Sequence, residues 1–139
     1  MHDDTKAIID LTIAYTWALD TRRFDELRDV FTPDATARLR GTECRGVDAI
    51  IERISGALGR LDASQHIVAN HQVRIDGDRA TCRCYLQAQH VKRALPDGDT
   101  FIIAGTYEDD LVRTAKGWRI DHRTLEVVWT SGNPLVVQR

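Results

Sequence analysis

The second half of the chain contains four long stretches with the composition of β-strands, separated by turn residues. They span about residues 63–76, 79–92, 100–113 and 117–130. The separating turns are Asp76-Gly-Asp78, Leu95-Pro-Asp-Gly-Asp99 and Thr114-Ala-Lys-Gly117. Asp-Gly is a strong hairpin signal, and short connections make consecutive strands antiparallel neighbours. The sequence therefore predicts one long antiparallel sheet in this half of the molecule.

The first half of the chain has mainly helical patterns. Apolar residues recur at 3.6-residue spacing from about residue 4 to 20, at Ile8, Leu11, Tyr15, Ala18 and Leu19. A short second helix over about 24–31 is stopped by Thr32-Pro33, and a strand pattern over 35–40 ends in a turn at Gly41. After Gly46 a third helix is expected, with a buried face formed by Val47, Ile50, Ile51, Ile54 and Leu58.

Helices followed by a long antiparallel meander indicate an α+β protein, with the helices on one face of the sheet. A long sheet twists and curls, so we expect a cone-shaped barrel in which the curved sheet wraps around two to three N-terminal helices. The wide end of such a cone can hold a small ligand between the first helix and the sheet. Residues 1–139 are expected to form a single domain.

The composition narrows the classes of partner. Hydrophobic residues make up 42% and charged residues 29% of the chain, and the net charge is -2 with both signs interleaved. No basic patch predicts binding to nucleic acid or to an anionic membrane. No apolar run reaches the roughly 18 residues of a membrane span, and the N-terminus lacks the pattern of a signal peptide. Cys44, Cys82 and Cys84 are odd in number, which favours reduced thiols and a cytoplasmic location.

Asp20 and His66 are the first candidates for chemistry. Asp20 ends the first helical pattern, where a carboxylate usually caps a turn or pairs with a neighbour such as Arg22 or Arg23. His66 lies in a predicted strand whose alternation places it on one face and His71 on the other. Histidine suits proton abstraction near neutral pH, and a carboxylate bonded to its far nitrogen would fix its tautomer. We therefore expect Asp20 and His66 to form a proton-transfer pair.

Arg123 is a third candidate, on the last predicted strand. An inward arginine offers fixed donors to a developing oxyanion. Alternation puts Trp118 and Ile120 on one face and Arg123 with Leu125 on the other, although all the apolar members suit a core. Either this strand is apolar on both faces or a bulge changes its register. His122 is expected to point away from Arg123.

Further side chains are candidates for contact with a ligand. Tyr15 can donate its hydroxyl to the pocket or simply belong to the apolar stripe of its helix. The other candidates for substrate binding are Trp17, Tyr85, His90, Tyr107 and Trp129. The sequence has no HxH, HExxH or CxxC spacing, no Gly-rich phosphate loop and no GxSxG, so neither a metal site nor another cofactor is expected.

Several of these residues stand in an order that resembles a known family. The pattern comprises Tyr15-x4-Asp20, Phe31-Thr-Pro-Asp-Ala35, Gly46 before a helix, His66-x3-Asn70, Tyr107-Glu-Asp-Asp110 and Gly117-Trp-Arg-Ile-x2-Arg123. It resembles the SnoaL-like branch of the nuclear transport factor 2-like superfamily, over nearly the whole chain. That superfamily includes polyketide cyclases, scytalone dehydratase, ketosteroid isomerase, a dehydrochlorinase, bile acid 7α-dehydratase and β subunits of ring-hydroxylating dioxygenases.

The resemblance implies an apolar pocket in an α+β cone, assembled as a homodimer or homotrimer through the sheet. Asp20, His66 and Arg123 match the positions of an Asp, a His and an Arg shared by the bile acid dehydratase and the dehydrochlorinase. Tyr15 matches the dehydratase and departs from the lysine of the dehydrochlorinase, which favours a hydroxyl over a halide leaving group.

These matches lead to a functional expectation with open alternatives. We expect a cofactor-independent lyase or isomerase, similar to a dehydratase or polyketide cyclase, that acts on a small hydrophobic cyclic substrate by His–Asp general base catalysis. Arg123 and Tyr15 would stabilise negative charge on the substrate. The alternatives are a non-catalytic small-molecule-binding protein, an assembly protein like a dioxygenase β subunit, and an epoxide hydrolase with an Asp–Arg–Asp set. An Asp20–His66 pair beyond hydrogen-bond reach, or without a pocket, would contradict the enzyme hypothesis.

Overall fold

The protein was analysed as a computed structural model that describes residues 3–138. Met1, His2 and Arg139, the ends of the expected 1–139 domain, lie outside the described residues. The helical elements are α1 (Asp4–Asp20), η1 (Phe24–Asp29), α2 (Val47–Leu58) and η2 (Pro134–Val137). The strands are β1 (Phe31–Leu39), β2 (Thr42–Arg45), β3 (Ala63–Asp76), β4 (Arg79–Val91), β5 (Thr100–Thr114) and β6 (Gly117–Gly132).

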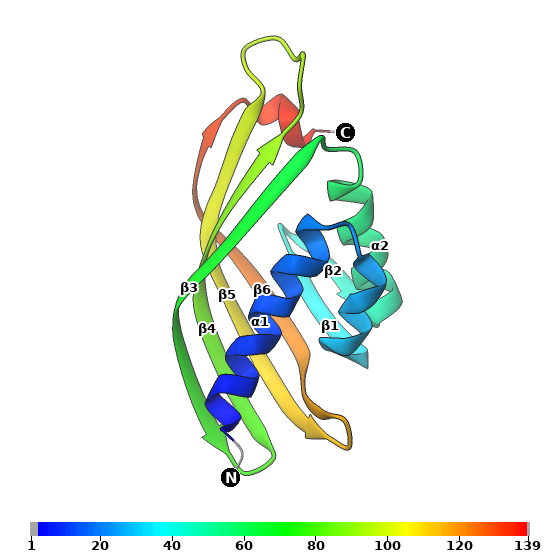
Figure 1. Ribbon diagram of the computed structural model, residues 1–139, viewed down its shortest axis with the longest axis vertical. Helices are drawn as coiled ribbons and strands as arrows, with labels where there is room; N and C mark the ends of the chain where they lie inside the picture. The colour runs from blue at the N-terminus through cyan, green and yellow to red at the C-terminus, as the bar shows by residue number, and fades with distance from the viewer. Residues whose placement is uncertain (1–2, 139) are drawn as a thin grey trace.

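The strands form one curved sheet in the order β2-β1-β6-β5-β4-β3, which wraps around the helices without closing into a complete barrel (Figure 1). The predicted α+β class and the antiparallel meander of β3 to β6 are confirmed. The meander is extended by β1, which pairs in parallel with β6, and by β2, which pairs antiparallel with β1. The parallel pairing joins segments far apart in sequence, so no local turn signal announces it.

β1 begins earlier than the sequence predicts, at Phe31 rather than about residue 35. η1 ends at Asp29, before the predicted stop at Thr32-Pro33, and both of these residues belong to β1 because a residue before proline favours extended backbone. The register with β6 is irregular between Phe31 and Thr36. An irregular stretch of this kind accommodates a proline that cannot donate to a ladder.

α1 lies across the inner face of the long strands (Figure 1). Its first turn is capped by Asp3, whose Oδ1 accepts a hydrogen bond from the Lys6 amide at 3.0 Å. Ile8, Tyr15 and Leu19 are buried on the face that meets the sheet. α2 buries Val47, Ile50, Ile54 and Leu58 beside β1 and β2. Each such side chain contributes about 1.5–3 kcal/mol on burial, so both helices are held by packing.

Two bulges in β6, one at Asp121 and one at Val128, decide which of its side chains face inward. Ile120 pairs with Leu111 and His122 with Asp110, so Asp121 is an extra residue. This bulge places Ile120 and Arg123 on the same buried face, which confirms the second alternative for this strand. His122 points outward, where its Nδ1 lies 2.6 Å from Thr36 Oγ1, as the sequence predicts.

A third bulge, in β3, overturns one prediction from alternation. The register shifts between Ala69 and Gln72, and Asn70 adopts a left-handed backbone with φ of 61°. His71 is thereby turned onto the same inner face as His66, and its Nε2 lies 2.7 Å from Thr12 Oγ1 on α1. The prediction that the two histidines face opposite sides is wrong because the strand is not regular.

Candidate active site

Asp20, at the end of α1, contacts His66 on β3. Asp20 Oδ1 lies 2.7 Å from His66 Nδ1, and Asp20 Oδ2 accepts a hydrogen bond from the His66 backbone amide at 2.7 Å. Ser64 Oγ donates to Asp20 Oδ1 at 3.0 Å, and Arg22 donates to Ser64 Oγ at 2.8 Å. The carboxylate that sequence leaves ambiguous between a cap and a catalyst is therefore the acceptor for three donors of β3.

These bonds fix the protonation of the pair. Burial alone would raise the pKa of Asp20, but the hydrogen bonds from His66 and Ser64 and the charge of His66 lower it below its ordinary value. An ionised carboxylate only accepts hydrogen bonds, so Nδ1 of a neutral His66 carries the proton. Nε2 is then left with its lone pair. The geometry thus presents a base rather than a donor at the far side of the ring.

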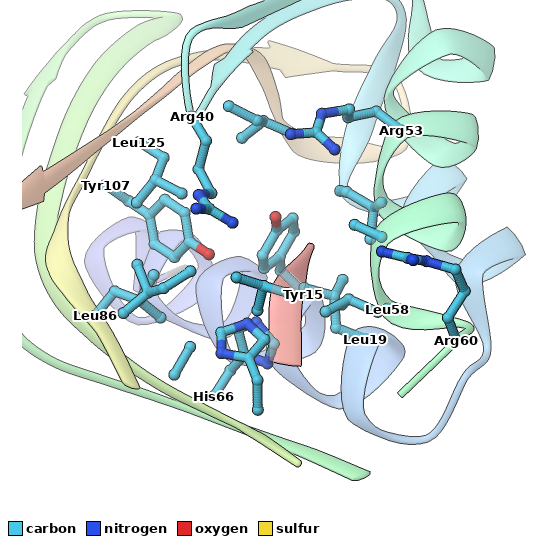
Figure 2. Close-up of a pocket in the computed structure, with 17 residues that line it drawn as sticks. Tyr15, Leu19, Arg40, Arg53, Leu58, Arg60, His66, Leu86, Tyr107 and Leu125 are labelled. Carbon is cyan, nitrogen blue, oxygen red and sulfur yellow. The ribbon is translucent and has the colours of Figure 1, made fainter. Parts of the chain in front are cut away.

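A cavity of about 290 Å³ opens beside His66 (Figure 2). Its wall combines apolar side chains from the helices and the sheet with a few polar groups. The lining residues are Tyr15, Leu19, Leu39, Arg40, Arg53, Ile54, Ala57, Leu58, Arg60, His66, Leu86, Ala88, His90, Ile103, Tyr107, Leu125 and Val137. Such a mixture of apolar walls and few polar groups is typical of sites for small molecules. None of the described lining residues is the Asp that an Asp–Arg–Asp epoxide hydrolase would need.

Tyr15 and Tyr107 present their hydroxyl groups to this cavity (Figure 2). Their rings meet edge to face, with centroids 5.5 Å apart. Burial raises the pKa of both phenols, while the positive charge of Arg123 opposes part of that rise. Both tyrosines are therefore protonated at neutral pH and can donate hydrogen bonds into the cavity.

Arg123 lies behind these two tyrosines rather than in the cavity wall. Its side chain is fully buried, and its guanidinium lies 4.3 Å from the ring centre of Tyr15 and 3.9 Å from that of Tyr107. Asp109, directly opposite on β5, accepts from Arg123 Nε at 2.7 Å and from Nη2 at 2.8 Å. Burial disfavours the charge of Arg123, but Asp109 raises its pKa and keeps the guanidinium charged.

This placement changes the role expected of Arg123. The sequence predicts a donor that touches the substrate, whereas the guanidinium is paired with Asp109 and covered by Tyr15 and Tyr107. Arg123 instead holds and polarises the two phenols from behind. Asp109 has a recognisable signal in retrospect, because it alternates with the inward Tyr107 and Leu111 along β5.

His90 also lines the cavity, near His66, with ring centres 5.9 Å apart. Its Nδ1 lies 3.0 Å from the backbone oxygen of Phe101, so Nδ1 carries the proton. Burial is the main cause that lowers the pKa of His90 to about 4, and the charge of His66 lowers it further. His90 is thus a neutral wall residue at pH 7 and a much weaker base than an ordinary histidine.

Three aromatic residues predicted to bind substrate lie outside the cavity. Trp17 is 66% exposed on α1, in an open groove beside β3. Tyr85 points to the outer face of the sheet because its neighbours Cys84 and Leu86 point inward. Trp129 pairs with Ala104, whereas Val127 pairs with Gly105, so Val128 is an extra residue that turns Trp129 to the outer face. A prediction that continues the strand alternation from Arg123 along β6 therefore assigns Trp129 to the wrong face, because the bulge lies between them.

Three arginines in the cavity wall escape sequence reasoning. Arg40 follows the end of β1, while Arg53 and Arg60 come from α2 and the turn after it. Arginine beside an apolar helical face is usually a solvent-exposed residue, so nothing local marks these three. Their convergence depends on the packing of α2 against the end of β1.

Other groups carry no sign of chemistry. The described residues contain no group of three or more His, Cys, Asp or Glu side chains arranged to hold a metal ion. Cys44, Cys82 and Cys84 are free and buried. Burial raises the pKa of Cys82 to about 12 and that of Cys84 to about 11, so neither is a ready nucleophile. Across residues 3–138, no helix has the length and apolar character needed to cross a membrane.

A curved sheet and helix layer that enclose such a cavity define a class of small α+β proteins with a site for a small molecule. The model of the SnoaL-like domain matches residues 2–124. The chain therefore belongs to the SnoaL-like domain family.

Similar proteins cover nearly the whole chain. An uncharacterised protein of Mycobacterium tuberculosis is 38% identical over 86% of this chain and 82% of its own. Terrestric acid biosynthesis cluster protein E of Penicillium crustosum is 30% identical over 94% of this chain and 86% of its own. A candidate aromatic ring hydroxylase from Novosphingobium aromaticivorans, known from a crystal structure, is 32% identical over 97% of this chain and 96% of its own. The two structures superpose with a TM-score of 0.85.

A hexachlorocyclohexane dehydrochlorinase, at 16% identity, shares the fold with a TM-score of 0.81 over 93% and 88% of the two chains.

Proposed function

We propose that the protein is a cofactor-independent lyase or isomerase for a small hydrophobic cyclic substrate with a carbonyl group. One observation carries the proposal: His66 Nδ1 lies 2.7 Å from the Asp20 carboxylate, and the imidazole forms part of the cavity wall. This distance is within hydrogen-bond reach, which the enzyme hypothesis requires of Asp20 and His66. The names of the Penicillium crustosum biosynthetic cluster protein and of the dehydrochlorinase agree with a catalytic role in the family.

In the proposed reaction His66 Nε2 removes a proton from the carbon next to the substrate carbonyl. The C–H electron pair becomes an enolate, and the imidazolium formed is stabilised by Asp20. Tyr15 and Tyr107 donate hydrogen bonds to the substrate oxygen, and Arg123 strengthens them by its charge. General base action is typically worth about 10²–10⁴ in rate, and one oxyanion donor adds about 3 kcal/mol.

The enolate then has two outcomes that need no added reagent. In an elimination, the electron pair expels a hydroxyl on the neighbouring carbon, which takes the proton from the His66 imidazolium and leaves as water, so that His66 is neutral again. In an isomerisation, His66 returns the proton to a different carbon. Tyr15 matches the tyrosine of the dehydratase that the sequence resembles and departs from the lysine of the dehydrochlorinase, which supports loss of oxygen over loss of halide.

The test uses His66→Ala and Asp20→Asn with a panel of hydroxylated cyclic ketones and steroids. We expect turnover to fall by about 10²–10⁴ in His66→Ala, with a smaller fall in Asp20→Asn. His122→Ala is the matched control, because it removes an imidazole from the outer face of β6. Unchanged turnover in both dyad variants would end the dyad proposal and favour a binding or assembly protein.

Two further expectations belong with this function. We propose that the protein works in the cytoplasm, because its three described cysteines are free and buried. Cell fractionation followed by immunoblotting tests this location, and finding the protein in an oxidising compartment would contradict it. We also propose a homodimer or homotrimer assembled through the outer face of the sheet.

A further inference from the structure

We propose that the substrate carries an anionic group, a carboxylate in the simplest case, bound by Arg40 and Arg53 at the end of the cavity away from His66. The inference rests on the proposed function for the reaction, but the binding it describes does not depend on turnover. Arg60 adds a third positive charge to the lining of the cavity.

The three arginines reach the cavity from different elements. Arg40 has a left-handed backbone with φ of 50° in the turn after β1, and Arg53 lies one residue before the buried Ile54 on α2. Figure 2 shows Arg40 and Arg53 on one side of the Tyr15 and Tyr107 hydroxyls, and His66 on the other. A cyclic ligand with its anion between the arginines would therefore extend past the tyrosines toward the base.

The guanidinium groups of Arg40 and Arg53 have no anionic partner in the described part of the chain. Neither residue belongs to an ion pair there. Arg53 Nε is buried, and it has no hydrogen-bond partner among the described residues. Arg60 is different, since it donates to the backbone oxygens of Gly56 and Gln138. A buried donor without an acceptor is costly, so the described residues leave the Arg53 guanidinium incompletely satisfied.

The electrostatics of the cavity also favour an anion. None of the described residues in its wall is Asp or Glu, although the chain as a whole has a net charge of -2. Partial desolvation and the charge of Arg53 lower the pKa of Arg40, which means that the two cations repel each other. The charge of Arg40 also lowers the pKa of His90 on the cavity wall. An oxyanion between the arginines would relieve this repulsion and accept hydrogen bonds from both.

The apolar wall distinguishes the expected ligand from a free inorganic anion. Leu39, Ile54, Leu58 and Leu125 line the same cavity as the arginines. A small anion would satisfy the charges but leave this surface unfilled. The chemical class that fits is therefore an apolar ring system with a carboxylate, or with another oxyanion of similar geometry.

Isothermal titration calorimetry with 2-naphthoate and its neutral isostere 2-naphthamide tests the inference. We expect the acid to bind wild-type protein at least about tenfold more tightly than the amide, because a charge-assisted hydrogen bond contributes that much. Added salt should weaken the acid more than the amide. The double variant Arg40→Met/Arg53→Met should lose the preference. Acetate, tested at the same concentrations, should bind far more weakly than 2-naphthoate.

Two variants separate this inference from the proposed function. Arg38 lies two residues before Arg40, on β1, and lines a groove on the outer surface, so Arg38→Met removes an equal charge and should keep the preference for the acid. His66→Ala should also keep it, even if turnover is lost. Equal affinity for acid and amide, no binding of the acid, or a preference that persists in the double variant would each overturn the inference. Acetate binding as tightly as 2-naphthoate would do so as well.

Discussion

At the scale of single residues, the Asp20 carboxylate organises the site, because it accepts hydrogen bonds from Ser64 and from both the backbone amide and the imidazole of His66. Asp20 and His66 are candidates because a carboxylate and an imidazole suit proton transfer, and the fold brings them together. Arg40 and Arg53 were not candidates because an arginine carries no sign of where its long side chain ends. Two of the three donors around Asp20 were equally invisible, since Ser64 and the His66 amide reach it only after α1 docks on β3.

His90 makes a prediction about pH dependence. Its pKa is lowered from 6.5 to about 4, so the unfolded chain binds more protons than the folded one between these values. The free energy of unfolding should therefore fall as the pH drops from about 6.5 to about 4, with His90 responsible for on the order of 3 kcal/mol. His71 adds in the same direction, because burial also lowers its pKa.

Urea unfolding at several pH values checks this expectation. His90→Gln keeps an amide that can donate to the Phe101 oxygen but cannot titrate, so its stability should change less over this range. The pKa of Asp20 is lowered, so its contribution to stability is fully present at pH values above the ordinary pKa of an aspartate. That contribution is lost only as the pH falls further, toward the lowered pKa. Parallel curves for His90→Gln and wild type would contradict the assignment to His90.

At the scale of elements, the long strands and both α-helices follow from sequence patterns and turn residues. What could not be predicted depends on contacts between distant segments. The parallel pairing of β1 with β6 and the short β2 arise from such contacts, as do the bulges that turn His71 inward and Trp129 outward. A strand read as strictly alternating gives the wrong face after each bulge.

The pair formed by Arg123 and Asp109 makes a prediction about β5 and β6. Arg123→Met leaves the fully buried Asp109 without its partner, so we expect the free energy of unfolding to fall by about 3–5 kcal/mol. The double variant Arg123→Met/Asp109→Leu should recover part of that loss, because no buried charge remains unpaired. Arg119→Met, also on β6 but less buried, should change stability by less than about 0.5 kcal/mol.

Urea unfolding of the four proteins measures these differences. A loss below about 1 kcal/mol in Arg123→Met would contradict the pairing. A double variant less stable than Arg123→Met would show that the Asp109 side chain makes other contacts that leucine cannot replace, and would contradict the assignment of the loss to an unpaired charge.

At the scale of the whole molecule, the outer face of the sheet carries a row of exposed apolar residues. Ile67, Tyr85 and Trp129 are 56%, 58% and 46% exposed, and cross-strand pairing puts them on the same face. Large aromatic residues on an open sheet face favour association. We therefore expect wild-type protein to be a dimer or trimer in solution.

Light scattering during gel filtration checks this expectation. Tyr85→Ser/Trp129→Ser should dissociate the oligomer, whereas Trp17→Ser, which removes an exposed tryptophan from α1, should leave it intact. A wild-type protein that remains monomeric at high micromolar concentration would contradict self-association through this face.

The proposed function requires Asp20 and His66 to remove a proton from a ligand in the cavity. Nuclear magnetic resonance in D₂O tests it most directly, by following exchange of the hydrogen next to the carbonyl in a panel of cyclic keto acids. We predict exchange with wild type and His122→Gln, and exchange slowed by about 10²-fold or more in His66→Gln and Asp20→Asn. Equal exchange rates in all four proteins, or no catalysed exchange by wild type for any keto acid, would contradict the proposed function.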